Sequence, residues 1–190
     1  MDDHLEIERR FLVDGRKEKP WREGSEVLLI EQHYNVATYL EMRAGALWYN
    51  DTNFAALTQS EIELLGKNIA WTTRLRKRNQ TYVLTYKSRI SNDTAFELEW
   101  VVEEEDALAL LASGPFPSIE KTRYVLTGSD GMVWEVDEFE GGLAGLILAE
   151  VELPSSQTEV VLPPWAGQEI TGLASWSNHA LAETLALRTG

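Results

Sequence analysis

The feature that most constrains this chain is an alternation of polar and apolar residues in which the charges come in same-sign pairs. Within the segment 94–103, Glu97 and Glu99 share one face, and Phe96 and Leu98 take the other. A period of two is typical of a β-strand. The polar face of an ordinary half-buried strand is mixed in sign and solvated, and like charges at neighbouring same-face positions repel. Same-sign pairs therefore indicate that opposite charges, a metal ion or a polyanion face them.

Eight segments show this alternation and are predicted to be strands. Turn residues such as Gly24-Ser25 and Ser91-Asn92-Asp93 punctuate several of the gaps. Because the connections are short, successive strands are expected to be antiparallel neighbours. The segments are approximately residues 4–13, 25–35, 70–79, 81–90, 94–103, 118–127, 131–140 and 146–153.

Three further segments have the marks of helices. Thr58 and Glu61 have the spacing of a capping box, and Gly66 ends that helix. Ser177 is a candidate cap for the last helix. The predicted helices are residues 58–65, 104–113 and 177–188. Residues 36–57 are apolar and aromatic without a clean period, and they indicate no particular element.

The charged faces suit the interior of a closed barrel. They carry eight acids and eight bases, on seven of the eight segments. Eight strands are about enough to close a barrel around one small ligand. We therefore predict a mainly β (α+β) fold: an eight-stranded antiparallel closed β-barrel with a charged lumen and a few helices covering its apolar outer face. The alternative is an ordinary sandwich with a salt-bridged surface. The acids are Glu6, Glu8, Glu97, Glu99, Glu135, Asp137, Glu150 and Glu152, and the bases are Arg10, Arg74, Arg76, Arg78, Lys87, Arg89, Lys121 and Arg123.

The composition bounds the class of protein and its partners. The 190 residues fit one domain over 1–190, and zero cysteines exclude disulfides and thiolate metal sites. With no spanning segment and no signal peptide, a cytoplasmic protein without a membrane partner is expected. A net charge of −14 argues against nucleic acid as a partner. Nine of the 17 Lys and Arg nevertheless lie between Lys67 and Arg123, a basic centre that suits an anion. A homodimer is a further expectation.

The two sets of charges suit a linear polyphosphate with a metal ion. Arginine binds phosphate oxygens with a planar fork and lysine binds them as a point charge. Clustered carboxylates suit hard divalent cations, Mg²⁺ or Mn²⁺, which also bridge phosphates. The three histidines, His4, His33 and His179, are too scattered for a zinc site.

These residues resemble the CYTH superfamily, also called triphosphate tunnel metalloenzymes. The N-terminal signature of that family is Glu-x-Glu-x-Lys, and the sequence here is Glu6-Ile7-Glu8-Arg9-Arg10, with arginine in the last place. The similarity covers roughly residues 4–34 and 70–182, so 36–67 has the character of an insertion. Further motifs follow in order: Thr-Arg-Leu-Arg (73–76), Leu-Thr-Tyr-Lys (84–87), Phe-Glu-Leu-Glu (96–99), Ile-Glu-Lys-Thr-Arg-Tyr (119–124), Trp-Glu-Val-Asp-Glu-Phe (134–139), Ala-Glu-Val-Glu-Leu (149–153), and Ile170-Thr171-Gly172 with Asn178.

The resemblance implies a tunnel enzyme that binds a triphosphate with Mg²⁺ or Mn²⁺. It implies metal ligation by Glu6, Glu8, Glu150 and Glu152, with Asp137 as a fifth ligand. It implies substrate contacts from Arg10, Arg74, Arg76, Lys87, Arg89, Lys121 and Arg123. Catalytic roles are assigned to Lys87, Lys121 and Asp137, and Glu97, Glu99 and Glu135 are supporting acids of the lumen.

The charged lining predicts the triphosphate but does not identify a group attached to it. We favour hydrolysis of inorganic triphosphate to pyrophosphate and phosphate, because that substrate needs nothing beyond the lining. The alternatives within the family are a class IV-type adenylyl cyclase and a thiamine or nucleoside triphosphatase. The non-enzyme alternative is a polyphosphate-binding module.

Overall fold

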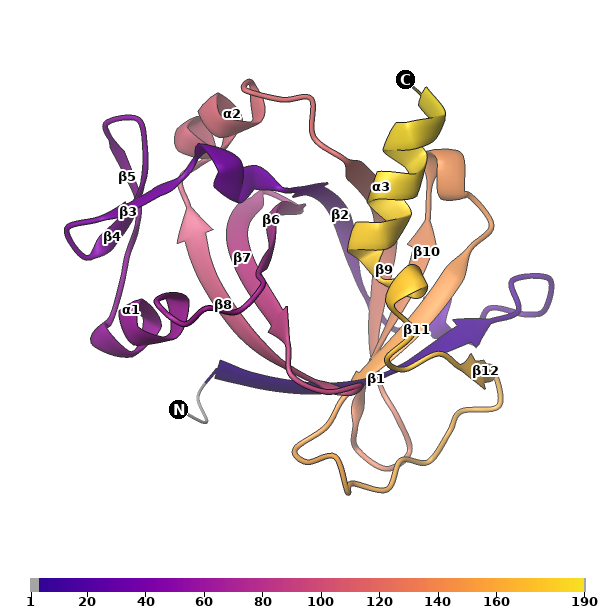
Figure 1. The fold of residues 1–190 in the computed structure, drawn as a ribbon. Helices are drawn as coiled ribbons and strands as arrows, with labels where there is room; N and C mark the ends of the chain where they lie inside the picture. The colour runs from indigo at the N-terminus through magenta and orange to yellow at the C-terminus, as the bar shows by residue number, and fades with distance from the viewer. Residues whose placement is uncertain (1–3, 190) are drawn as a thin grey trace.

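The computed structural model describes residues 4–189 and shows a closed barrel of eight antiparallel strands (Figure 1). All eight predicted strands are confirmed, and the sandwich alternative is wrong. The strands are β1 (Leu5–Val13), β2 (Glu26–Tyr34), β6 (Thr72–Arg78), β7 (Thr81–Arg89), β8 (Thr94–Val102), β9 (Ser118–Thr127), β10 (Val133–Phe139) and β11 (Ile147–Glu152). Their order around the barrel is β1, β8, β7, β6, β2, β9, β10 and β11, which pairs with β1 again.

Strand β1 closes the barrel because it has a different partner on each edge. Its first three residues pair with β8, and its later residues pair with β11. Beyond the end of β8, the short strand β12 (Ala166–Glu169) pairs with the last part of β1. The β1–β11 register places Glu8 directly opposite Glu152 and Arg10 opposite Glu150. Since alternate residues of a strand share a face, all four side chains lie on the lumen face.

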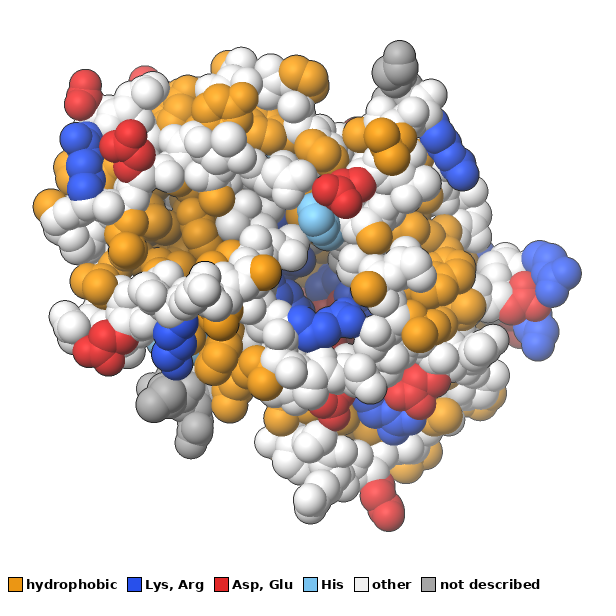
Figure 2. Space-filling view, viewed as in Figure 1, with side chains coloured by type: hydrophobic (Ala, Val, Ile, Leu, Met, Phe, Trp, Pro, Cys, Tyr) orange, Lys and Arg blue, Asp and Glu red, His pale blue; other side chains and the backbone are white. Residues whose placement is uncertain are grey.

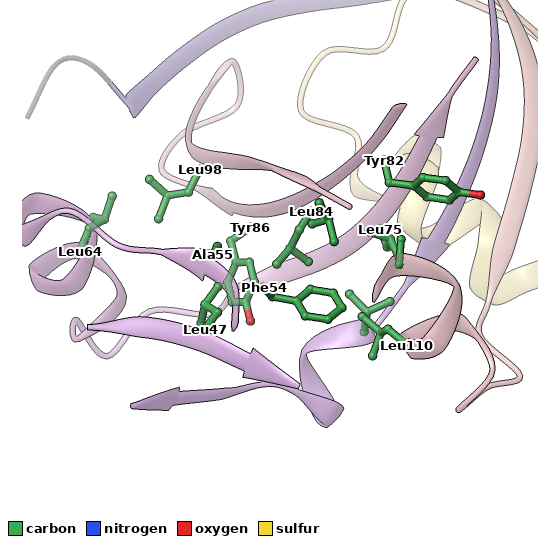
Figure 3. Packing of buried hydrophobic residues seen from close by; sticks show 13 residues of the cluster. Leu47, Phe54, Ala55, Leu64, Leu75, Tyr82, Leu84, Tyr86, Leu98 and Leu110 are labelled. Atoms are coloured by element: carbon green, nitrogen blue, oxygen red, sulfur yellow. The ribbon is translucent and has the colours of Figure 1, made fainter. Parts of the chain in front are cut away.

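The apolar faces of the strands point outward, as predicted, and other segments cover them. On one side the cover consists of a small sheet, helix α1 (Gln59–Leu65) and helix α2 (Glu104–Leu111). Figure 3 shows this cluster, in which side chains of the cover pack on the outer face of β6, β7 and β8. The labelled residues are Leu47, Phe54, Ala55, Leu64, Leu75, Tyr82, Leu84, Tyr86, Leu98 and Leu110.

Helix α1 begins at the predicted capping box, which also anchors it to the barrel. The backbone N–H of Glu61 donates to Thr58 Oγ1 (3.3 Å), and the N–H of Thr58 donates to Glu61 Oε2 (2.6 Å). The other carboxylate oxygen of Glu61 accepts a hydrogen bond from Trp100 Nε1 on β8 (2.9 Å). One side chain therefore both starts the helix and fixes its position against the outer wall.

Residues 36–57, for which the sequence indicated no element, form a 3-10 helix η3 (Val36–Tyr39) and a three-stranded sheet. Its strands are β3 (Glu41–Arg43), β4 (Ala46–Tyr49) and β5 (Thr52–Ala56). Two-residue turns connect them, and Ala44, Gly45 and Asn50 have positive φ. Each strand is too short to show a period.

Helix α3 (Asn178–Thr189) covers one end of the barrel interior (Figure 1). As predicted, Ser177 caps it, because the N–H of Ala180 donates to Ser177 Oγ (3.2 Å). On β2, β9, β10 and β11 the lumen-facing residues at this end are Tyr34, Ile119, Phe139 and Leu148, and α3 packs on them. The cluster consists of Tyr34, Ile119, Phe139, Leu148, Ile170, Leu181, Ala182 and Leu185. Across residues 4–189, no helix has the length and apolar character needed to cross a membrane.

Glu138 fastens the connection between β1 and β2 to the outer face of β10. Its carboxylate accepts hydrogen bonds from Lys19 Nζ (3.0 Å), Trp21 Nε1 (3.0 Å) and the Arg22 guanidinium (2.6 and 2.7 Å). Trp21 is fully buried and packs edge-on against Trp165. Burial opposes ionisation, but the three donors lower the pKa of Glu138 to about 2.

We expect Glu138→Gln to destabilise the fold at pH 7 by about 1–3 kcal/mol, because charge-assisted hydrogen bonds are lost. The folded-state pKa of Glu138 lies below its ordinary value of 4.5, so this stabilisation is complete above that pH and is lost as the pH falls towards about 2. Urea unfolding of both proteins at pH 7 and pH 3 measures the effect, with Glu18→Gln in the same connection as the control. A difference of equal size at both pH values would contradict the ionic role.

Candidate active site

A cavity of about 170 Å³ lies inside the barrel, and its walls carry most of the predicted site residues. Arg89 instead lines the wider mouth of the tunnel, and Lys121 and Asp137 are fully buried in the wall beside Arg123. The predicted residues that line the cavity are Glu6, Glu8, Arg10, Arg74, Arg76, Lys87, Glu97, Glu99, Arg123, Glu135, Glu150 and Glu152.

The lumen bases of β6 pair with acids of β8, across the intervening β7. Arg76 on β6 donates to Glu99 Oε1 on β8 (2.9 Å), and Thr85 on the intervening β7 donates to the same oxygen (2.8 Å). Arg74 lies 3.6 Å from Glu97. A charge removed from water is tolerated only with a partner, so these pairs let both signs share a closed lumen.

Lys87 shows how the acids of β1 and β8 surround a cation. Its ammonium contacts Glu6 and lies 3.2 Å from both Glu8 and Glu97. Among the described residues, no three acidic or histidine side chains already have the spacing of a metal site. The three carboxylates around Lys87 are nevertheless oxygen ligands of the kind that hard divalent cations bind, and the ammonium has the place of such a cation. The residues therefore fit Mg²⁺ or Mn²⁺ by their chemistry.

Glu97 and Glu150 differ from Glu6 and Glu152 in the direction of their pKa shifts. Burial opposes ionisation of these four carboxyl groups, yet Arg74 and Lys87 lower the pKa of Glu97 to about 2. Arg10 and Arg123 likewise lower the pKa of Glu150.

In the other group, burial and neighbouring carboxylates raise the pKa of Glu6 to about 8 and also raise the pKa of Glu152. Glu8 and Glu152 lie directly opposite each other on adjacent strands, where like charges are destabilising. This end of the lumen therefore has more acid than the bases neutralise, which again fits a bound cation.

Arg123 is the centre of a buried network in the wall of the lumen. Its guanidinium donates to both oxygens of Asp137 (2.7 Å each), contacts Glu135, and lies 3.2 Å from Glu150. Lys121 Nζ donates to Asp137 as well (2.5 Å). Burial lowers the pKa of Lys121 to about 8, although Asp137 opposes the shift. Both oxygens of Asp137 thus hold bases, and its predicted ligation of a metal stays a prediction.

The two mouths of the tunnel differ in charge. The mouth beside α3 holds about 420 Å³, and its lining includes four bases, Arg10, Arg74, Lys87 and Arg89, against two acids, Glu8 and Asp93. Figure 2 shows this face, where Lys and Arg side chains gather in a hollow. Among the described residues, the opposite mouth is lined by five glutamates and no Lys or Arg. They are Glu6, Glu61, Glu97, Glu99 and Glu152.

Three contributions to the site come from residues outside the predicted set. Strand β2 brings the neutral residues Gln32 and Tyr34 to the lumen face, and the Tyr34 hydroxyl donates to Gln32 Oε1 (2.9 Å). Glu61 reaches the acidic mouth from α1, inside the predicted insertion. Asn178, at the start of α3, lines both the cavity and the basic mouth. The sequence indicated Asn178 only as the last residue of the family-like motif that begins at Ile170, without a role in the site.

Known proteins resemble this chain in sequence and in fold. No family model matches it. A curated relative from Acetivibrio thermocellus, named inorganic triphosphatase, is 35% identical over 113 residues, which is 58% of this chain and 70% of the relative. Another of that name, from Nitrosomonas europaea, is 32% identical over 156 residues, 80% of this chain and 95% of the relative. A crystal structure of an inorganic triphosphatase has a TM-score of 0.56 at 27% identity and covers 93% of both chains.

We expect Asp137→Asn to destabilise the fold by about 3–5 kcal/mol, because it leaves Arg123 and Lys121 without their buried counter-charge. Urea unfolding without added metal measures the effect. Glu120→Gln, at an exposed position on the same strand as Lys121, is the matched control and should be near neutral. If Asp137→Asn were as stable as the control, Asp137 would not hold this network together.

Proposed function

Because this chain belongs to the CYTH superfamily of triphosphate tunnel metalloenzymes, we propose that it is a triphosphatase acting on inorganic triphosphate. Water adds across one phosphoanhydride bond, and the products are pyrophosphate and phosphate. The observation that carries the proposal is the closed cavity with facing acids and bases. We further propose that the protein is a homodimer and is cytoplasmic.

The bases of the lumen bind and orient the substrate. Arg74, Arg76 and Arg123 come from β6 and β9, on either side of β2, and line one cavity. Their guanidinium groups match phosphate oxygens in planar geometry and neutralise the charge that gathers there during phosphoryl transfer. Their present carboxylate partners keep them in place before the substrate binds.

The carboxylates of β1 and β11 are the proposed ligands of Mg²⁺ or Mn²⁺. Glu6, Glu8, Glu150 and Glu152 all lie on the lumen face, in strands that pair directly. A divalent cation there supplies charge neutralisation and orientation for the reacting phosphate. It also relieves the repulsion between the opposed carboxylates of Glu8 and Glu152.

The two proposed catalytic lysines differ in position. Lys87 lines the cavity, so its ammonium can contact substrate oxygens directly. Lys121 and Asp137 are fully buried. Asp137 accepts hydrogen bonds from both Lys121 and Arg123, and of these three residues Arg123 lines the cavity. We assign Lys87 to substrate binding, and Lys121 with Asp137 to holding Arg123 in place.

The lining supports the inorganic substrate over one with an organic group. Among the described residues that line the cavity, none is aromatic, and the apolar ones are Leu28 and Ile30. Nucleobases and other organic ring systems are held mainly by stacking on aromatic side chains. The cavity therefore provides for the phosphates alone.

We expect the purified protein to release phosphate from tripolyphosphate when Mg²⁺ or Mn²⁺ is added, and to lose this activity in excess EDTA. The reason is that, without a cation, the opposed carboxylates repel the reacting phosphate, so the bases of the lumen still bind the substrate but no hydrolysis follows. A colorimetric phosphate assay measures it, with ATP, thiamine triphosphate and pyrophosphate as comparison substrates. Undiminished turnover in EDTA would contradict the metal requirement, and cyclic AMP as the main product from ATP would contradict the hydrolase.

We expect Arg76→Ala to lower kcat/KM for tripolyphosphate by about 100-fold, the scale of a lost charge-assisted contact of about 3 kcal/mol. The matched control is Lys77→Ala on the same strand, whose ammonium lies over the Tyr82 ring on the outer face. It should change kcat/KM less than about twofold. An equal loss of kcat/KM in the two variants would show that the substrate does not bind in the lumen.

A further inference from the structure

Helix α3 presents its N-terminus to the basic mouth of the tunnel. Asn178, His179 and Ala180, its first three residues, line that mouth. Ser177 Oγ accepts from the N–H of Ala180, whereas the N–H groups of Asn178 and His179 have no acceptor within residues 4–189. Free N–H groups and the positive end of the helix dipole favour an anion at this position.

The side chain of Asn178 is a second and independent sign of a ligand. Only 6% of the residue is exposed, and its Oδ1 is buried without a hydrogen-bond partner. The side chain lines the central cavity as well as the mouth. A buried amide oxygen without a partner is costly, so a side chain in this state is expected to serve a ligand. With no protein partner fixing it, the amide can turn its NH₂ group towards the cavity.

Two arginines complete the surroundings of this amide. Arg10 and Arg74 line the same cavity and the same mouth as Asn178. The Arg10 guanidinium also donates to the carbonyl of Trp176 (3.0 Å), which ties it to the segment just before α3. Helix terminus, amide and guanidinium groups therefore meet at one end of the tunnel, opposite the acidic mouth.

We propose that Asn178 and the N-terminal N–H groups of α3 bind one terminal phosphate of the triphosphate, at the end of the tunnel beside the basic mouth. This inference rests on the proposed function and adds the orientation of the substrate in the tunnel. The substrate lies with one end against α3 and the other end towards the glutamates of β1 and β11. Asn178 is then a substrate-binding residue whose contribution comes from a neutral donor.

Two variants of this residue separate binding from folding. Asn178→Ala removes the donor and should raise the Kd for tripolyphosphate about tenfold. Asn178→Asp keeps the shape but puts a negative charge beside the phosphate, so its Kd should rise at least about threefold further. A carboxylate in the first turn favours the helix itself, so Asn178→Asp should unfold at a temperature no lower than Asn178→Ala.

Isothermal titration with sodium tripolyphosphate in EDTA measures these affinities without turnover, so the result does not depend on the proposed hydrolysis. Where hydrolysis is observed, KM should follow the same order. Asn53→Ala, on the exposed face of β5, is the matched control and should bind like the wild type. Wild-type affinity in both variants, or an affinity in Asn178→Asp equal to or tighter than in Asn178→Ala, would overturn the proposal.

Discussion

The pairing of buried charges is the constraint on which the rest of this barrel depends. A lumen that carries both acids and bases is stable only when opposite signs meet, because an isolated charge removed from water is very costly. The order of the strands provides this: Arg76 reaches across β7 to Glu99, and Arg123 holds Asp137 on the adjacent β10. The same pairs keep the bases extended in the positions where a phosphate would meet them.

Filling the lumen with charge reverses the usual arrangement of a small barrel, since the apolar faces must then be buried from outside. The small sheet β3–β5 with α1 and α2 covers one side, and the connection that carries Trp165 covers another. Helix α3 packs on an apolar stretch of the lumen wall, around Tyr34 and Phe139. The covers also shape the tunnel, because Glu61 comes from α1 and Asn178 from α3. The same covering segments therefore bury the apolar faces of the barrel and make its two mouths different.

Much of this could be predicted from the sequence, because a period of two assigns each side chain to a face. This periodicity does not show how far along the barrel a side chain lies, or whether it reaches the cavity. Lys121 and Arg123 share a face, yet Lys121 is fully buried whereas Arg123 lines the cavity. Parity predicted β2 as a strand but marked no site residue on it, because its lumen residues are neutral. The strands β3–β5 are three to five residues long, which is too short for a pattern. Contacts between distant segments, such as Asn178 with the lumen, leave no local trace.

A crystal structure of the protein with tripolyphosphate and Mn²⁺ tests the central claim most directly, with anomalous scattering used to place the metal. We expect the triphosphate inside the barrel, its oxygens on Arg74, Arg76 and Arg123, and manganese on the carboxylates of β1 and β11. The bases should have exchanged their carboxylate partners for phosphate. A triphosphate bound outside the barrel, or a lumen whose ion pairs are unchanged at saturating ligand, would show that the paired charges serve stability alone.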